Sequence, residues 1–321
     1  MRIGWIAGLV ALGTVGAIAP AAAEGCGPLQ IFASLDATES KTGAVLVSLG
    51  IDDTKGYFKL EFGQPVSGIT GQVSDLLQKK RTAVDQNITV NIAGQSVKEM
   101  VNVKLTFGAT SGTDWLGVIP EPVRGDQTIS GTIGYDILRH FDVELDLTHN
   151  KVNLFSQDHC PGKVVYWTHT ATVAAIPFIT RKSQAFLVPM QLDGKDIEVQ
   201  VATDDDHDYL NARIAQLNFG ISPAADGPGN SGPKPLPFKT LSVDGLTINN
   251  PVVYPYGSVT AEACNGGARY HSEGLRNETH QFVETCFGQP DLFLGRATLR
   301  HLRVFLAFGE KMLYATPADA Q

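Results

Sequence analysis

The densest group of charged side chains in the sequence is the run Asp204-Asp205-Asp206-His207-Asp208. Clustered carboxylates are ligands that hard cations such as Ca²⁺ prefer. The run lacks the glycine and the terminal glutamate of an EF-hand loop, however. We therefore interpret it as a solvated loop and expect no metal site.

A second set of residues with possible chemistry is an even number of cysteines. These are Cys26, Cys160, Cys264 and Cys286. The chain begins with the secretory pattern described below, and an even set of cysteines in such a chain favours disulfides over free thiols. The first two bracket the first half of the chain and the last two lie close together in one polar segment, so we predict Cys26 with Cys160 and Cys264 with Cys286.

A zinc site is the alternative for the second pair, because His271 and His280 lie between its two cysteines. The spacings match no usual zinc module, and the thiolates would have to stay reduced after export. The sequence also lacks a Gly-x-Ser-x-Gly motif, a glycine-rich phosphate loop and a Cys-x-x-Cys pair. We expect no cofactor. Five scattered residues are interpreted as core or surface positions: His140, His149, His159, His169 and Trp115.

The elements that carry these residues are organised around a repeated segment. Residues 133–145 align with residues 294–306 at a constant offset, and Gly, Leu, Arg, His, Val and Leu recur identically. Each copy predicts a short helix whose Leu faces the core and whose Arg and His face solvent. Each is followed by a hairpin, which continues into residues 151–155 in the first copy and 311–314 in the second.

Short β-rich runs bounded by turn signals fill most of the remainder, and they predict a mainly β protein built twice. About 300 residues follow the predicted leader at residues 1–23, which is near the size at which one core becomes two. We place the first lobe at residues 24–165 and the second at 166–321. A Pro-, Gly- and Asn-rich segment at residues 222–237 is predicted to lack fixed secondary structure.

Residues 1–23 have the pattern of a secretory signal. Arg2 gives a positive start, residues 3–19 are almost wholly apolar, and residues 21–23 are alanines. We expect an exported protein, periplasmic or secreted. A lipid anchor through Cys26 is disfavoured because Glu24 lies where such a signal requires small or apolar residues. No later apolar stretch is long enough for a membrane span, so we expect no stable membrane insertion once the signal is removed.

The net charge of −8, with both signs interspersed, argues against a phosphate-binding face. We therefore expect no nucleic-acid partner. The oligomeric state stays open.

The end of the first half resembles the first-lobe ending of bacterial exported aspartic proteases of the pepsin and retropepsin superfamily. The resemblance is carried by Gly-Tyr-Asp-Ile-Leu-Arg at residues 134–139, Asn-Leu-Phe-Ser at 153–156 and Asp-His-Cys-Pro-Gly at 158–162. It implies a mainly β fold with two homologous, barrel-like lobes, each closing with a short helix and a hairpin. It also implies one Asp-Thr-Gly turn in each lobe, whose two carboxylates share a proton and activate a water.

Neither Asp-Thr-Gly nor Asp-Ser-Gly occurs in the sequence. In the first lobe, the strand at residues 56–60 leads into Glu61-Phe62-Gly63, so Glu replaces Asp. In the second, the strand at residues 197–201 leads into Ala202-Thr203-Asp204, and a helix at residues 209–218 is expected to follow. The nearest related string, Asp53-Thr54-Lys55, is interpreted as a surface turn.

These losses favour a non-catalytic homologue that binds an extended peptide or an exported protein in a cleft between the lobes. One alternative is an active endopeptidase that uses Glu61 with a carboxylate from residues 204–208. Another is a structural or assembly factor of the cell envelope that acts through its outer surface.

Overall fold

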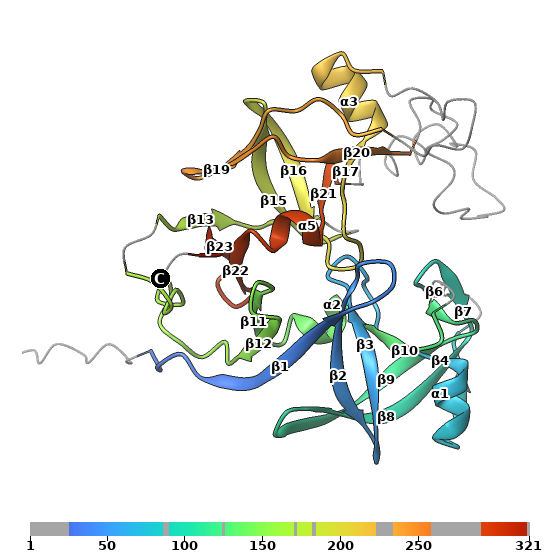
Figure 1. Ribbon diagram of the computed structural model, residues 1–321. Coiled ribbons are helices and arrows are strands. Elements are labelled where there is room, and N and C mark those ends of the chain that lie inside the picture. The colour runs from blue at the N-terminus through green and yellow to red at the C-terminus, as the bar shows by residue number, and fades with distance from the viewer. Residues whose placement is uncertain are drawn as a thin grey trace, which may run out of the picture.

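The computed structural model describes residues 26–85, 90–123, 126–169, 172–181, 184–222, 234–257 and 290–319. Within these ranges the chain is mainly β, with two barrel-like lobes and a sheet that both lobes share (Figure 1). The predicted fold class is confirmed. No helix among the described residues has the length and apolar character that crossing a membrane requires.

The first lobe contains a closed barrel of six strands. In spatial order they are β2 (Val45–Ile51), β3 (Thr54–Leu60), β10 (Ile129–Ile133), β4 (Gly68–Thr70), β9 (Thr110–Ile119) and β8 (Glu99–Phe107). The barrel closes because β8 returns to pair with β2, where Gly50 lies opposite Thr106. Alternate residues of β8 are buried, as expected for strands with one face toward a core.

Smaller elements complete this lobe. They are β5 (Arg81–Ala83), the hairpin of β6 (Val90–Ile92) and β7 (Gln95–Val97), and the helix α1 (Gly71–Leu76). Thr70 ends β4 and caps α1, because its side chain accepts a hydrogen bond from the Val73 N–H.

The second lobe is a half-barrel rather than a closed barrel. Its strands, in spatial order, are β19 (Leu246–Asn249), β18 (Thr240–Val243), β15 (Gln184–Leu192), β16 (Lys195–Val201), β21 (Leu292–Leu294), β17 (Asp208–Asn211) and β20 (Val253–Tyr256). Strand β14 (Ile179–Arg181) pairs with β15 alone.

The two lobes meet in a run of six antiparallel strands, called here the central sheet. Its strands, in spatial order, are β1 (Ile31–Glu39), β12 (Lys151–Phe155), β11 (Asp142–Asp146), β22 (Leu302–Ala307), β23 (Met312–Pro317) and β13 (Ala174–Pro177). The first three come from the first half of the chain and the last three from the second half. The halves join where Val143 and Leu145 of β11 lie opposite Leu306 and Val304 of β22.

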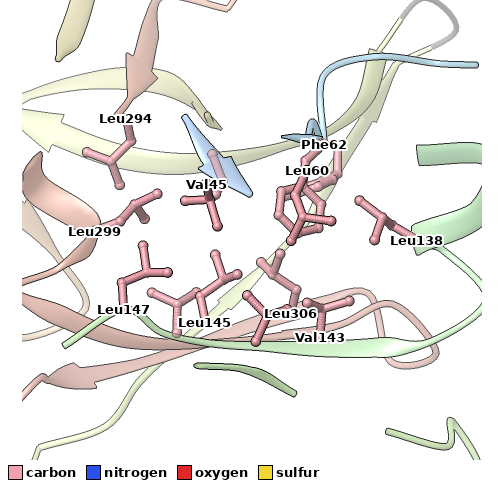
Figure 2. Close-up of a cluster of buried hydrophobic side chains, with 14 of the residues drawn as sticks. Val45, Leu60, Phe62, Leu138, Val143, Leu145, Leu147, Leu294, Leu299 and Leu306 are labelled. Atoms are coloured by element: carbon pink, nitrogen blue, oxygen red, sulfur yellow. The ribbon is translucent and has the colours of Figure 1, made fainter. Parts of the chain in front are cut away.

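One face of the central sheet packs into a core that both halves build. Figure 2 shows Val143, Leu145 and Leu306 beneath Leu138 and Leu299. These two leucines end the short helices α2 (Tyr135–Leu138) and α5 (Arg296–Leu299), and each is 1 % exposed. The helix that closes each lobe therefore anchors it to the same core.

The expected helix at residues 209–218 is wrong at its start. Residues 208–211 form β17, and α3 (Ala212–Phe219) begins only after Asn211, whose side chain accepts a hydrogen bond from the Arg213 N–H. The reason is pairing with a distant strand, since Tyr209 and Leu210 lie opposite Phe293 and Leu292 of β21. Of the segment predicted to lack structure, residues 223–233 lie outside the described ranges, and Leu236 forms an isolated bridge with Val253.

Candidate functional site

The two candidate turns occupy equivalent places in the two lobes. Strand β3 runs parallel to β10, and the Glu61 N–H donates to the Ile133 carbonyl at 3.0 Å. Strand β16 runs parallel to β21 in the same way, and the Ala202 N–H donates to the Leu294 carbonyl at 2.9 Å. The registers therefore match Glu61 to Ala202.

The turns touch each other across the lobe interface. The Thr203 hydroxyl donates to the Leu60 carbonyl at 2.8 Å, and the Val45 N–H donates to the Thr203 carbonyl at 2.7 Å. Gln200 reaches across to Gly63, where an added methyl would lie 2.1 Å from its amide nitrogen. The two hydrogen bonds of Thr203 connect the lobes. Because Thr203 is fully buried, its side chain is not available to solvent.

Glu61 is the counter-ion of a buried lysine. Its Oε2 lies 2.9 Å from Lys59 Nζ and accepts a hydrogen bond from the Thr132 hydroxyl at 3.1 Å. The Lys59 side chain is 2 % exposed and that of Glu61 is 16 % exposed. An ammonium removed from water in this way requires a close opposite charge, and Glu61 supplies it.

Phe62 occupies the position at which the Asp-Thr-Gly turn of the aspartic proteases has threonine. It is fully buried, and its ring centroid lies 6.1 Å from that of Phe186 and 6.2 Å from that of Phe308. Both partner rings come from the second half of the chain, so Phe62 joins the lobes by apolar packing instead of by a hydroxyl group.

The interpretation of residues 204–208 as a solvated loop is wrong at Asp208. This side chain is buried, and its oxygens accept hydrogen bonds from the Gly295 N–H at 2.7 Å and the Thr298 hydroxyl at 2.5 Å. Burial raises the pKa of Asp208 to about 6, although both hydrogen bonds act in the opposite direction. Ser67 has the matching role in the first lobe, where its hydroxyl accepts from the Gly134 N–H. Because Ser67 and Asp208 are different residue types, the sequence carries no signal of this match.

Asp206, in the same run, is held by an arginine that connects the lobes. Arg296 lies 3.0 Å from Asp206 and 2.6 Å from Glu39, and it donates to the Gly43 carbonyl at 3.1 Å. Glu39 and Gly43 belong to the β1–β2 hairpin. Sequence reasoning missed both Lys59 and Arg296, because nothing in their local pattern indicates a distant partner.

A cavity of about 460 Å³ lies on the second lobe, between β13, β15 and the β18–β19 turn, and neither candidate turn lines it. The edge of β13 beside this cavity has few free N–H groups with which an added strand could pair. The Ala175 N–H already donates to Asp244 at 2.8 Å, and Pro177 has no N–H. We assign this cavity no role.

The structure joins Cys26 to Cys160 in a disulfide, the first of the two predicted pairings. Cys264 and Cys286 lie outside the described residues, as do His271 and His280 of the zinc alternative. In the part of the chain that the structure describes, no three His, Cys, Asp or Glu side chains are grouped as metal ligands would be.

Comparison with known proteins gives the fold and no closer relationship. No family model matches the chain, and no curated protein matches its sequence. A solved structure that does match is basic 7S globulin from soybean, with a TM-score of 0.51 and 8 % identity over 91 % of this chain and 99 % of that one. The soybean protein has the fold of the pepsin-like aspartic proteases. The chain thus shares the fold of that class, and at this identity the likeness extends to the fold alone.

Proposed function

We propose that this protein is an exported, non-catalytic relative of the aspartic proteases that binds an extended polypeptide between its lobes. One observation carries the first half of the proposal. At the matched positions of the two lobes, one turn presents a glutamate held by Lys59 and the other presents the methyl group of Ala202.

Aspartic-protease chemistry requires two carboxylates about 3 Å apart, so that they share one proton and polarise a water between them. Ala202 cannot supply the second carboxylate. The run at residues 204–208 is a poor substitute, because Asp206 is bound by Arg296 and Asp208 is buried against Thr298. These contacts argue against Asp206 and Asp208 as the partner of Glu61 in an active peptidase.

Peptide binding is supported by what remains of the architecture. Recognition of an extended segment uses main-chain hydrogen bonds and side-chain pockets, and neither requires the catalytic carboxylates. The Glu61 side chain is 16 % exposed, so part of the first-lobe turn reaches solvent. Export is supported by the leader pattern and by the Cys26–Cys160 disulfide.

The test separates the two halves of the proposal. The chain without its leader is incubated with fluorescently labelled, denatured casein from pH 3 to 7, and cleavage and fluorescence anisotropy are followed together. We expect binding with a Kd in the roughly micromolar range and no pepstatin-sensitive cleavage. Cleavage would refute the non-catalytic assignment, and absence of binding would refute the peptide-binding assignment.

Cross-linking then locates the binding surface. A casein peptide with a photoreactive group is expected to attach to solvent-accessible residues around Glu61. Attachment confined to the outer strands of the lobes would instead favour an assembly factor that acts through its outer surface.

A further inference from the structure

A buried ionisable cluster lies on the face of the central sheet opposite the shared core. Asp142 of β11 faces His159, which follows β12, and Asp142 Oδ2 lies 2.6 Å from His159 Nε2. The two side chains are 0 % and 1 % exposed. Val143 and Leu145 of the same strand face the core, as the alternation of a strand requires.

A second carboxylate reaches this histidine from the other half of the chain. Glu310, in the β22–β23 turn, has Oε1 3.6 Å from His159 Nδ1. Its carboxylate also accepts hydrogen bonds from the Gly162 N–H at 3.0 Å and from the Tyr314 hydroxyl at 2.7 Å. One imidazole therefore lies between two carboxylates, and the second of these is also bound by the Tyr314 hydroxyl.

This arrangement favours retention of protons. Burial alone would lower the pKa of His159, but the hydrogen bonds to Asp142 and to the Cys160 carbonyl, with the charges of Asp142 and Glu310, raise it above its ordinary value. Burial raises the pKa of Asp142, against the hydrogen bonds from His159 and from the Gly309 N–H. Both groups thus hold a proton more tightly in the folded chain than in the unfolded one.

We propose that Asp142, His159 and Glu310 form a pH-dependent latch that holds the segment between the lobes against the central sheet. In the acidic state, the charged imidazole offsets the two carboxylates and ties residues 156–168 to both halves of the sheet. As the pH rises and the ring proton leaves, the buried Asp142 carboxylate and the Glu310 carboxylate, which is 12 % exposed, face a neutral ring, and the segment is released.

The latched segment covers apolar surface. Val164 is fully buried over Phe155 and Phe305, and the Trp167 indole donates to Thr316 at 2.9 Å. Release therefore uncovers these rings and moves Trp167. The disulfide at Cys160 limits the movement, because it still joins the segment to the start of the chain.

The first measurement is direct. Nuclear magnetic resonance of the full chain with labelled histidine gives the pKa of each imidazole. We expect His159 to titrate above the ordinary value of about 6.5. Hydrogen exchange, corrected for intrinsic rate, is expected to show residues 156–168 losing protection by roughly tenfold or more between pH 6 and pH 8.5.

Variants identify the groups responsible. His159→Gln removes the titrating ring and is expected to abolish the pH-dependent part of the exchange. Glu310→Gln keeps an acceptor for Gly162 but removes the charge, so it is expected to lower the pKa of His159. His149→Gln is the matched control, since His149 pairs with Asp146 at 2.8 Å but is 64 % exposed, and it is expected to change neither result.

The latch is overturned if His159 titrates at or below about 6.5, or if protection of residues 156–168 is independent of pH. If His159→Gln does not fold, Glu310→Gln decides the matter. An unchanged His159 pKa in that variant would contradict the proposed role of Glu310.

Discussion

Replacing Glu61 with glutamine removes the charge that faces the Lys59 ammonium at 2.9 Å. Breaking a buried ion pair from one side leaves the other charge without compensation, which typically costs 3–5 kcal/mol. Because Glu61 keeps some contact with solvent, we expect Glu61→Gln to lower the free energy of unfolding by about 3 kcal/mol. Urea denaturation at pH 7 measures this loss.

The double variant Lys59→Met with Glu61→Gln is the control. Removing both charges and filling the site with apolar atoms is expected to restore most of the lost stability. An equal loss in both variants would contradict the counter-ion role. The double variant is also the cleaner test of the peptidase alternative, because lost activity in Glu61→Gln alone would be confounded with lost stability.

Asp208 gives a second prediction for a single residue. Its pKa is raised from 3.8 to about 6, so between these values the folded chain binds more protons than the unfolded chain. Its contribution to stability is therefore present at acidic pH and is lost as the pH rises through this window, by about 2–3 kcal/mol. Asp208→Asn keeps an acceptor for the Gly295 N–H and removes the titration. The stability of the variant relative to the native chain should rise by this amount from pH 4 to 7, and a constant difference would refute the assignment.

At the scale of elements, Gly134 and Gly295 begin the closing helices of the two lobes. A methyl group at Gly134 would lie 2.5 Å from the Gln64 carbonyl oxygen, and one at Gly295 would lie 2.2 Å from the His207 carbonyl oxygen. Both contacts are with backbone, which cannot turn aside as a side chain can. We expect Gly295→Ala to destabilise the fold by about 1–3 kcal/mol or more.

Gly112→Ala is the matched control, since a methyl group at Gly112 would meet nothing within 4 Å. Its melting temperature should stay close to that of the native chain. Similar losses in the two variants would mean that the close approach at Gly295 is not the cause.

Elements differ in how far the sequence predicts them. The closing helices follow from the repeated pattern, because one leucine in each must face the core, and Leu138 and Leu299 do so. Strand β17 was not predictable, because its pairing partners β20 and β21 are more than 40 residues away in the chain. The candidate turns follow the predicted strands, but the Lys59 contact of Glu61 depends on a side-chain direction that no local pattern encodes.

The whole molecule should become less stable as the pH rises above the mildly acidic range. The pKa values of Asp142, His159 and Asp208 are all raised, so each group holds protons more tightly in the folded chain. Only Asp126, whose pKa is lowered by hydrogen bonds from Thr128, acts in the opposite direction among the resolved carboxyls and imidazoles of the described residues. We expect the melting temperature to fall by roughly 5–10 °C between pH 5 and pH 8. A higher melting temperature at pH 8 would contradict this sum of effects.

The central sheet also has a consequence for biosynthesis. Its last two strands, β22 and β23, lie at residues 302–317, so β11 remains without its neighbour until almost the whole chain has been made. At the usual rate of synthesis, the second half takes roughly 10–30 s to emerge, and an uncovered strand edge invites self-association during that time. Strand β11 carries Asp142, Glu144 and Asp146, and charges on an open edge discourage such pairing. The same carboxylates are later covered and bound by His159 and Arg303. We therefore expect them to discourage edge pairing in the nascent chain before they join its two halves.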